Sequence, residues 1–252
     1  PSNAVAAIEA RCKGRTLLFD LALAPAQSVL LALGDKPFPS SRRAAAEGKA
    51  LPLAGKWRVA RMDENALTID HVRTPGKGEV WSSLEYVLFA AEELKTAGGV
   101  ARARYEFTIE AMPKGPLHLA LERPERWQIS VNGRAVPSAS KGYFVDTEFK
   151  RINITRFALP GRNVVEIVGK VTDDFELEST YLVGDFGVVR RDGSFVVTER
   201  PTEVRSTDLS HEGFAFFAGT VDIEKEIKLP RAPKRAAFIL GELAAGAAEL
   251  FV

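Results

Sequence analysis

The sequence predicts an all-β protein, an antiparallel β-sandwich with few short helices. From Ala101 to Ile109 every second residue is apolar and the residues between them are charged or polar, which is the period of a half-buried strand. Residues 127–136 form two extended segments joined by Asn132-Gly133, a pair that tolerates the positive φ values of a two-residue hairpin turn. Three further turn sequences contain Gly or Pro: 112–116, 159–163 and 191–194. Short strands between regularly spaced turns are typical of sandwiches and jelly rolls.

Residues 1–50 are predicted to be the end of a preceding β-sandwich followed by a linker. Thr16–Leu23 and Gln27–Leu33 are apolar segments separated by Pro25, and we expect a strand in each. Two strands cannot form a stable domain alone, so they must pack on a sheet elsewhere in this chain or in another one. Pro, Ser and small residues dominate 37–50, where a short helix is expected at 42–48.

The main domain is predicted at 51–210. Leu53, Trp57 and Val59 supply its first apolar anchors. From Leu84 to Lys95 the apolar residues are spaced to share one face, which indicates a helical or irregular segment. Strands are expected in ten segments: 66–70, 100–109, 117–122, 127–131, 134–136, 144–145, 152–154, 164–168, 181–189 and 195–197.

An internal repeat predicts a second, partial β-sandwich at 211–252. Gly219–Leu229 echoes Gly99–Ile109 at an offset of 120 residues, and Ala248–Val252 corresponds to Trp127–Val131 at an offset of 121. The second copy stops where the first has its Asn-Gly turn, so its last strand would carry an unpaired edge. That edge could pair with 5–35 or with a separate polypeptide. The alternative is a chance similarity between two amphipathic β segments.

Composition excludes several classes of protein. The 252 residues include 34 Lys and Arg against 33 Asp and Glu, with no long run of one sign. No nucleic-acid partner and no membrane partner is therefore expected. No apolar run approaches the roughly 18–20 residues that a membrane-spanning helix needs. Cys12 is the single cysteine, which excludes an intrachain disulfide and leaves the cellular compartment open.

Several motifs, taken in order, resemble a known family. They are Leu53-x-Gly55-x-Trp57, the strand at 100–109, Trp127-x-Ile129-x-Val131-Asn132-Gly133, Asp146 and the run 152–163. Together they resemble the galactose-binding-like, sugar-binding jelly roll of glycoside hydrolases. The closer resemblance is to the C-terminal accessory region of large rhamnosidase-like glycosidases. Three further segments resemble parts that precede or follow the jelly roll there: Leu23–Ser28, Tyr181–Val188 and Gly213–Gly219.

The resemblance covers about 15–252 and implies a galactose-binding-like jelly roll at 51–210. In such enzymes the catalytic carboxylates lie on a barrel domain N-terminal to this region, so no catalytic residue is carried over. The implied partners are the catalytic domain of the same parent protein and carbohydrate. The resemblance alone suggests a periplasmic or extracellular location.

Three functions remain compatible with the sequence. The first is a non-catalytic accessory region that braces the catalytic domain and contacts carbohydrate, and we favour it. The second is a stand-alone carbohydrate-binding module. The third is a fragment that contributes to a glycosidase active site completed by missing polypeptide. No catalytic residues are identifiable in the sequence, because His71, His118 and His211 are isolated and no two carboxylates are paired by spacing.

Sugar binding would use aromatic rings that stack on apolar sugar faces and planar polar groups that bind hydroxyls. The candidate rings are Tyr143, Trp81, Trp127 and Tyr181, and the candidate polar groups are Asp146, Glu148 and Arg151. Tyr143 follows a Lys-Gly loop sequence and is the better candidate, together with Trp81. Trp127 shares a face with Ile129 and Val131, which favours core packing.

The family resemblance also suggests a structural calcium ion, the single cofactor considered. Ca²⁺ takes six to eight oxygen ligands, many of them from loops. The densest group of such oxygens lies at Asp173, Asp174, Glu176 and Glu178. The alternative is a solvated acidic loop, and ligation of a metal by His or Cys lacks every familiar spacing.

Overall fold

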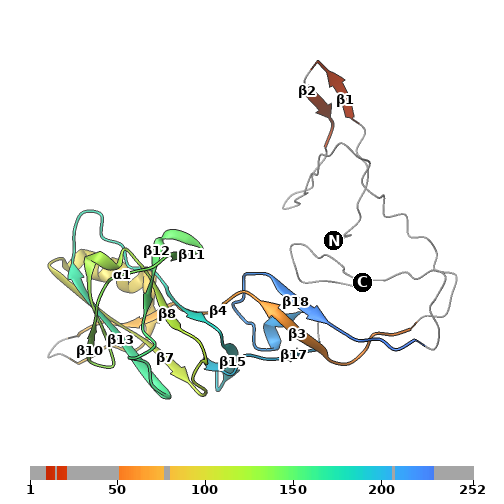
Figure 1. Ribbon diagram of the computed structural model, residues 1–252. Helices are drawn as coiled ribbons and strands as arrows, with labels where there is room; N and C mark the ends of the chain where they lie inside the picture. Colours follow the sequence, from red (N-terminus) through yellow and green to blue (C-terminus); the bar gives the residue numbers. More distant parts are fainter. Residues whose placement is uncertain (1–9, 15, 22–50, 77–79, 206–207, 230–252) are drawn as a thin grey trace. The chain divides into compact units, whose positions relative to one another are not determined.

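The computed structural model describes residues 10–14, 16–21, 51–76, 80–205 and 208–229 (Figure 1). They belong to two compact units that divide between Pro52 and Leu53. In the first unit β1 (Ala10–Lys13) and β2 (Thr16–Phe19) form an antiparallel hairpin. This confirms a strand at the start of the predicted segment 16–23. The predicted strand at 27–33 and the predicted helix at 42–48 lie outside the described residues.

The second unit contains a β-sandwich, as the sequence predicts. Its larger sheet has eight strands in the order β10-β9-β13-β7-β16-β15, with β5 beside β7 and β6 beside β5. The strands of this sheet are β5 (His71–Arg73), β6 (Glu85–Tyr86), β7 (Val100–Ile109), β9 (Trp127–Val131), β10 (Arg134–Val136), β13 (Gly161–Lys170), β15 (Gly187–Arg191) and β16 (Ser194–Thr198). All pairs are antiparallel except β16 with β7.

The smaller sheet has five antiparallel strands in the order β11-β12-β8-β14-β4. These are β4 (Asn65–Ile69), β8 (Leu117–Glu122), β11 (Tyr143–Phe144), β12 (Asp146–Asn153) and β14 (Thr180–Gly184). β4 and β5 are separated by Asp70 alone, so the chain passes from one sheet to the other at this residue. The predicted single strand at 181–189 is therefore wrong, because it breaks after Gly184 and its two halves join different sheets.

The core lies between the two sheets and follows the alternation of the sequence. In β7 the inward residues Tyr105, Phe107 and Ile109 are buried, and the residues between them are partly exposed. They pack in one cluster with side chains of the smaller sheet such as Leu119 and Leu182. The Tyr105 hydroxyl donates a 2.7 Å hydrogen bond to the carbonyl of Glu178, so this buried polar group is satisfied. Burial raises the pKa of Tyr105 far above its usual value.

One α-helix, α1 (Val87–Ala97), accompanies the sandwich in the described part of the chain and confirms the helical alternative for 84–95. Val87 and Ala90 are buried against the core, and Leu94 is partly buried against it. Gly98, with φ of 67°, ends the helix by donating its amide to the carbonyl of Leu94. The 3₁₀ turns η2 (Pro124–Arg126) and η3 (Leu209–His211) are shorter.

The hairpin turns also agree with the sequence. Asn132 and Gly133 have φ of 52° and 75°, and Asp192 and Gly193 have φ of 47° and 88°. Positive φ at both central residues is the signature of a type I′ turn, whose twist suits an antiparallel hairpin. The turns connect β9 to β10 and β15 to β16.

A three-stranded sheet of order β17-β3-β18 completes this unit. It consists of β3 (Trp57–Met62), β17 (Glu203–Val204) and β18 (Val221–Glu224), around a small core of Val59, Val204 and Phe214. β18 lies in the predicted repeat and pairs with β3, so the described residues 208–229 share a compact unit with 53–205. The predicted counterpart at 248–252 lies outside the described residues.

No helix within the described ranges is long and apolar enough to cross a membrane.

Candidate functional site

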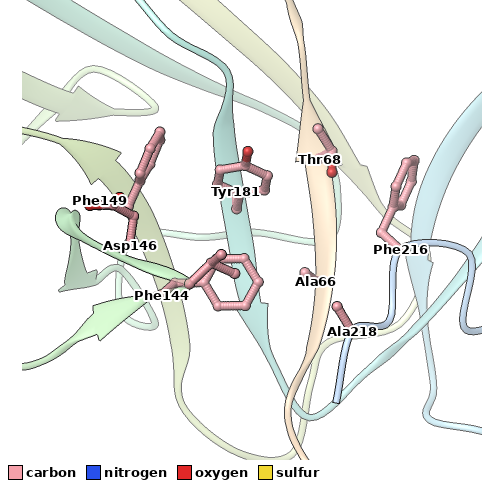
Figure 2. Close-up of a pocket in the computed structure, with 9 residues that line it drawn as sticks. Ala66, Thr68, Phe144, Asp146, Phe149, Tyr181, Phe216 and Ala218 are labelled. Atoms are coloured by element: carbon pink, nitrogen blue, oxygen red, sulfur yellow. The ribbon is translucent and has the colours of Figure 1, made fainter. Parts of the chain in front are cut away.

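An aromatic pocket of about 180 Å³ lies on the outer face of the five-stranded sheet. Figure 2 shows the side chains of β4 and β14 in the middle, residues of β11 and β12 on one side, and Phe216 with Ala218 on the other. Nine residues line it: Ala66, Thr68, Phe144, Val145, Asp146, Phe149, Tyr181, Phe216 and Ala218. Four of them are aromatic, which gives the pocket flat apolar walls.

Strand alternation places these side chains on the outer face. Thr68 follows Leu67 and precedes Ile69, and both neighbours belong to the core. Tyr181 pairs with Thr68 across the β4–β14 ladder and precedes the buried Leu182. Because successive side chains of a strand point to opposite faces, Thr68 and Tyr181 must point away from the core.

Tyr181 is the central ring of the pocket. Its ring centroid lies 5.3 Å from that of Phe144 and 5.4 Å from that of Phe149, in tilted and edge-on arrangements. Burial raises the pKa of Tyr181, and the neighbouring Glu178 and Tyr86 raise it further. The phenol is therefore protonated at neutral pH and can donate a hydrogen bond. The carboxylate of Asp146, which accepts a 2.8 Å hydrogen bond from the amide of Glu148, is a second polar group at the pocket.

Val145 has an unusual backbone conformation at the rim of this pocket. Its φ is 63°, although it is β-branched, and its side chain is 80% exposed. The strand register shifts between Tyr143 and Phe144, so the hairpin is irregular here. A β-branched residue in the left-handed region is strained by about 1–2 kcal/mol. Local strain of this kind clusters at binding sites.

Replacing Val145 with glycine is expected to stabilise the protein by about 1 kcal/mol, because relief of the strain exceeds the entropy that glycine loses on folding. Urea denaturation measures the change. Val100, 63% exposed in β7 and without a positive φ, is the matched control. Val100→Gly should destabilise, since glycine weakens a regular strand. Destabilisation by Val145→Gly would show that Val145 is not strained.

Of the residues that the sequence suggested for sugar binding, Tyr181 and Asp146 line the pocket. Tyr143 precedes the lining residue Phe144, pairs with Lys150 and is 57% exposed, but it is not part of the lining. Trp127 packs against the core with its ring edge-on to Phe175, at 6.0 Å between centroids.

Trp81 lies on the outer face of the other sheet. The guanidinium carbon of Arg104 is 3.7 Å from its ring centroid, and that of Arg102 is 5.4 Å away. Both arginines also form ion pairs with Glu166 at 2.8 Å. The Trp81 ring therefore makes cation–π contacts within the protein.

Glu148 and Arg151 have protein partners away from the pocket lining. Glu148 pairs with Arg123 at 3.2 Å. Arg151 donates to Glu64 at 2.7 Å and lies 3.0 Å from Nδ1 of His118. Burial lowers the pKa of His118, and the nearby Arg151 charge lowers it further. The neutral imidazole can thus accept a hydrogen bond from Arg151.

The acidic segment considered for calcium has arginine partners. Arg126 donates to Asp174 at 2.6 Å and, with Thr172, lowers the pKa of that carboxyl to about 2. Glu176 lies 3.4 Å from Arg123. Asp173 is exposed, and Glu178 contributes its carbonyl to the bond with the Tyr105 hydroxyl. Among the residues that the structure describes, no group of three or more His, Cys, Asp or Glu side chains is arranged to hold a metal ion.

Sequence reasoning missed seven of the nine lining residues, among them three of the four aromatic ones. Thr68, Phe144, Phe149 and Phe216 come from four separate segments, and pairing of distant strands brings them together. One local signal was present: Phe149 alternates with Arg151 in β12, which places both side chains on the same face. Nothing in the local pattern around Phe216 indicates a contact with β4.

Comparison of the chain with protein-family models, curated proteins and solved structures finds no match.

Proposed function

We propose that this chain is a non-catalytic β-sandwich accessory region of a rhamnosidase-like glycoside hydrolase, which braces the catalytic domain of the same protein and binds a sugar in the aromatic pocket. The observation that carries the sugar-binding part is the convergence of Phe144, Phe149, Tyr181 and Phe216 around one open hollow. Apolar faces of sugar rings stack on such side chains, and the Tyr181 hydroxyl and Asp146 carboxylate supply a donor and an acceptor for sugar hydroxyls.

The size of the pocket supports a small ligand. At about 180 Å³ it falls below the roughly 300–1,000 Å³ of pockets that enclose drug-sized ligands. It therefore suits one sugar ring. Glycoside hydrolysis requires two carboxyl groups across a cleft, and Asp146 is the single carboxylate among the nine lining residues. The geometry supports binding better than it supports hydrolysis.

Tyr181→Ala is expected to weaken binding of a methyl glycoside by about tenfold or more, because the central ring is lost. Isothermal titration of the isolated chain with methyl rhamnoside and methyl galactoside measures the affinity. Tyr143→Ala is the matched control, since it removes a ring next to the pocket that does not line it. Circular dichroism melts of both variants would verify that they remain folded.

Two results would contradict the proposal. Equal affinities of the Tyr181→Ala variant and the original protein would show that the pocket is not the sugar site. Hydrolysis of an aryl rhamnoside by the isolated chain would disprove the non-catalytic part.

A further inference from the structure

A second group of exposed rings lies at the start of α1. Tyr86 is 39% exposed and Phe89 is 68% exposed, and their ring centroids are 6.0 Å apart in an edge-on arrangement. The imidazole of His71 lies 5.9 Å from the Tyr86 ring, also edge-on. The rings of Tyr86 and Phe89 therefore form one exposed aromatic surface at the start of the helix.

Polar groups accompany these rings. Nδ1 of His71 lies 2.7 Å from the carboxylate of Asp70, and the two side chains are 53% and 46% exposed. An exposed imidazole and an exposed carboxylate beside two aromatic rings supply what a sugar needs: flat apolar surface for its ring and fixed partners for its hydroxyls.

This second group begins at the end of β4, the strand that carries the pocket residue Thr68. Thr68 lines the pocket, and Asp70 follows two residues later along the same segment. A strand rises about 3.3 Å per residue, so the Cα atoms of Thr68 and Asp70 are about 7 Å apart along the chain. The pKa of Tyr181 is raised first by burial, then by Glu178 and then by Tyr86. Tyr86 is therefore an electrostatic neighbour of this pocket residue.

The backbone holds the second group in place. His71 pairs with Tyr86 in the β5–β6 ladder, and the amide of Val87 donates a 2.9 Å hydrogen bond to the carbonyl of Asp70. The residues on either side, Val72 and Val87, are fully buried. The rings and the polar pair therefore stand on a rigid support, which lowers the entropy lost on binding.

We infer that Asp70, His71, Tyr86 and Phe89 form a second sugar platform next to the pocket, and that the ligand of this chain is an oligosaccharide rather than a single sugar. The inference rests on the proposed sugar-binding function. An oligosaccharide with one sugar ring in the pocket would extend along the end of β4 and stack its next sugar ring on the platform.

The test compares ligands of different length. Isothermal titration would use methyl rhamnoside, methyl galactoside, and the di-, tri- and tetrasaccharides of each sugar. We expect the longer ligand to bind about fivefold tighter or more, as one additional aromatic contact would give. Phe89→Ala should abolish this gain and leave the affinity for the methyl glycoside unchanged, whereas Tyr181→Ala should weaken both.

Leu88→Ala is the matched control, because Leu88 is the neighbouring exposed apolar residue of α1, at 46% exposure. It should leave every affinity unchanged. Equal affinities for the methyl glycoside and the oligosaccharides, or a gain that survives Phe89→Ala, would overturn the second platform while the pocket stands. Absence of binding to any probe would overturn the proposed function and the platform with it. If Leu88→Ala removes the gain in oligosaccharide affinity as completely as Phe89→Ala does, the second platform is also overturned, since a general apolar surface would then be responsible.

Discussion

Replacing Asn163 with alanine is expected to lower the free energy of unfolding by about 3 kcal/mol or more. Asn163 is fully buried. Its amide nitrogen donates to the carbonyls of Leu159 and Gly161 at 2.7 and 2.9 Å, and its oxygen accepts from the Leu159 amide and the Asn132 side chain, both at 2.8 Å. Each buried polar group left without a partner costs about 1–3 kcal/mol.

The effect should extend to the hairpin turn between β9 and β10. Asn132, the first residue of that turn, also donates to the carbonyl of Phe157 and accepts from the amide of Val164, both at 3.0 Å. One connected network thus joins this turn to the 159–163 turn, and urea denaturation would measure its contribution. Asn153→Ala is the control, since exposed Asn153 caps only the amide of Thr155. A similar small loss in both variants would contradict the importance of the network.

Gly187→Ala is expected to destabilise the protein by about 2–3 kcal/mol for a steric reason alone. A Cβ atom at this position would lie 2.5 Å from the backbone carbonyl oxygen of Glu199 and 3.0 Å from Cδ of Pro201. Backbone and a proline ring cannot move aside as a flexible side chain could. Forcing an additional methyl group into such a site typically costs about 1–3 kcal/mol. Thermal or urea denaturation measures the loss.

Gly115 is the matched control for this substitution. A Cβ atom there would lie 3.8 Å from Cβ of Asp185, an ordinary van der Waals contact, and like Gly187 it has no positive φ. Gly115→Ala should therefore change stability by less than about 0.5 kcal/mol. Equal stability of the two variants would mean that β15 can shift away from the 199–201 segment without loss.

Much of the fold follows from local sequence patterns. The alternation from Ala101 to Ile109 correctly predicts which side of β7 is buried, and Asn132-Gly133 correctly marks a type I′ turn. These succeed because the strand period and the φ preference of a turn are properties of a few adjacent residues. The break after Gly184 is harder to predict, since both parts of 181–189 are apolar enough for a buried strand and the break depends on the short turn signal Gly184-Asp185 alone.

The candidate site is less predictable for a related reason. Tyr181 and Phe149 lie on β14 and β12, which are separated in the sheet by β8, and their contact depends on a strand order that no local pattern contains. The acidic segment shows the same limit, because the partners of Asp174 and Glu176 are arginines about fifty residues earlier in the sequence. At Val145 the sequence is misleading, since a β-branched side chain disfavours the positive φ that this residue adopts.

The corner at Asp70 has a mechanical consequence. One uninterrupted segment supplies β4 to the smaller sheet and β5 to the larger, and the amide of Val87 clamps the corner from α1. A pulling force applied to β4 is therefore transmitted through the backbone to both sheets of the sandwich, instead of detaching one edge strand from a single sheet.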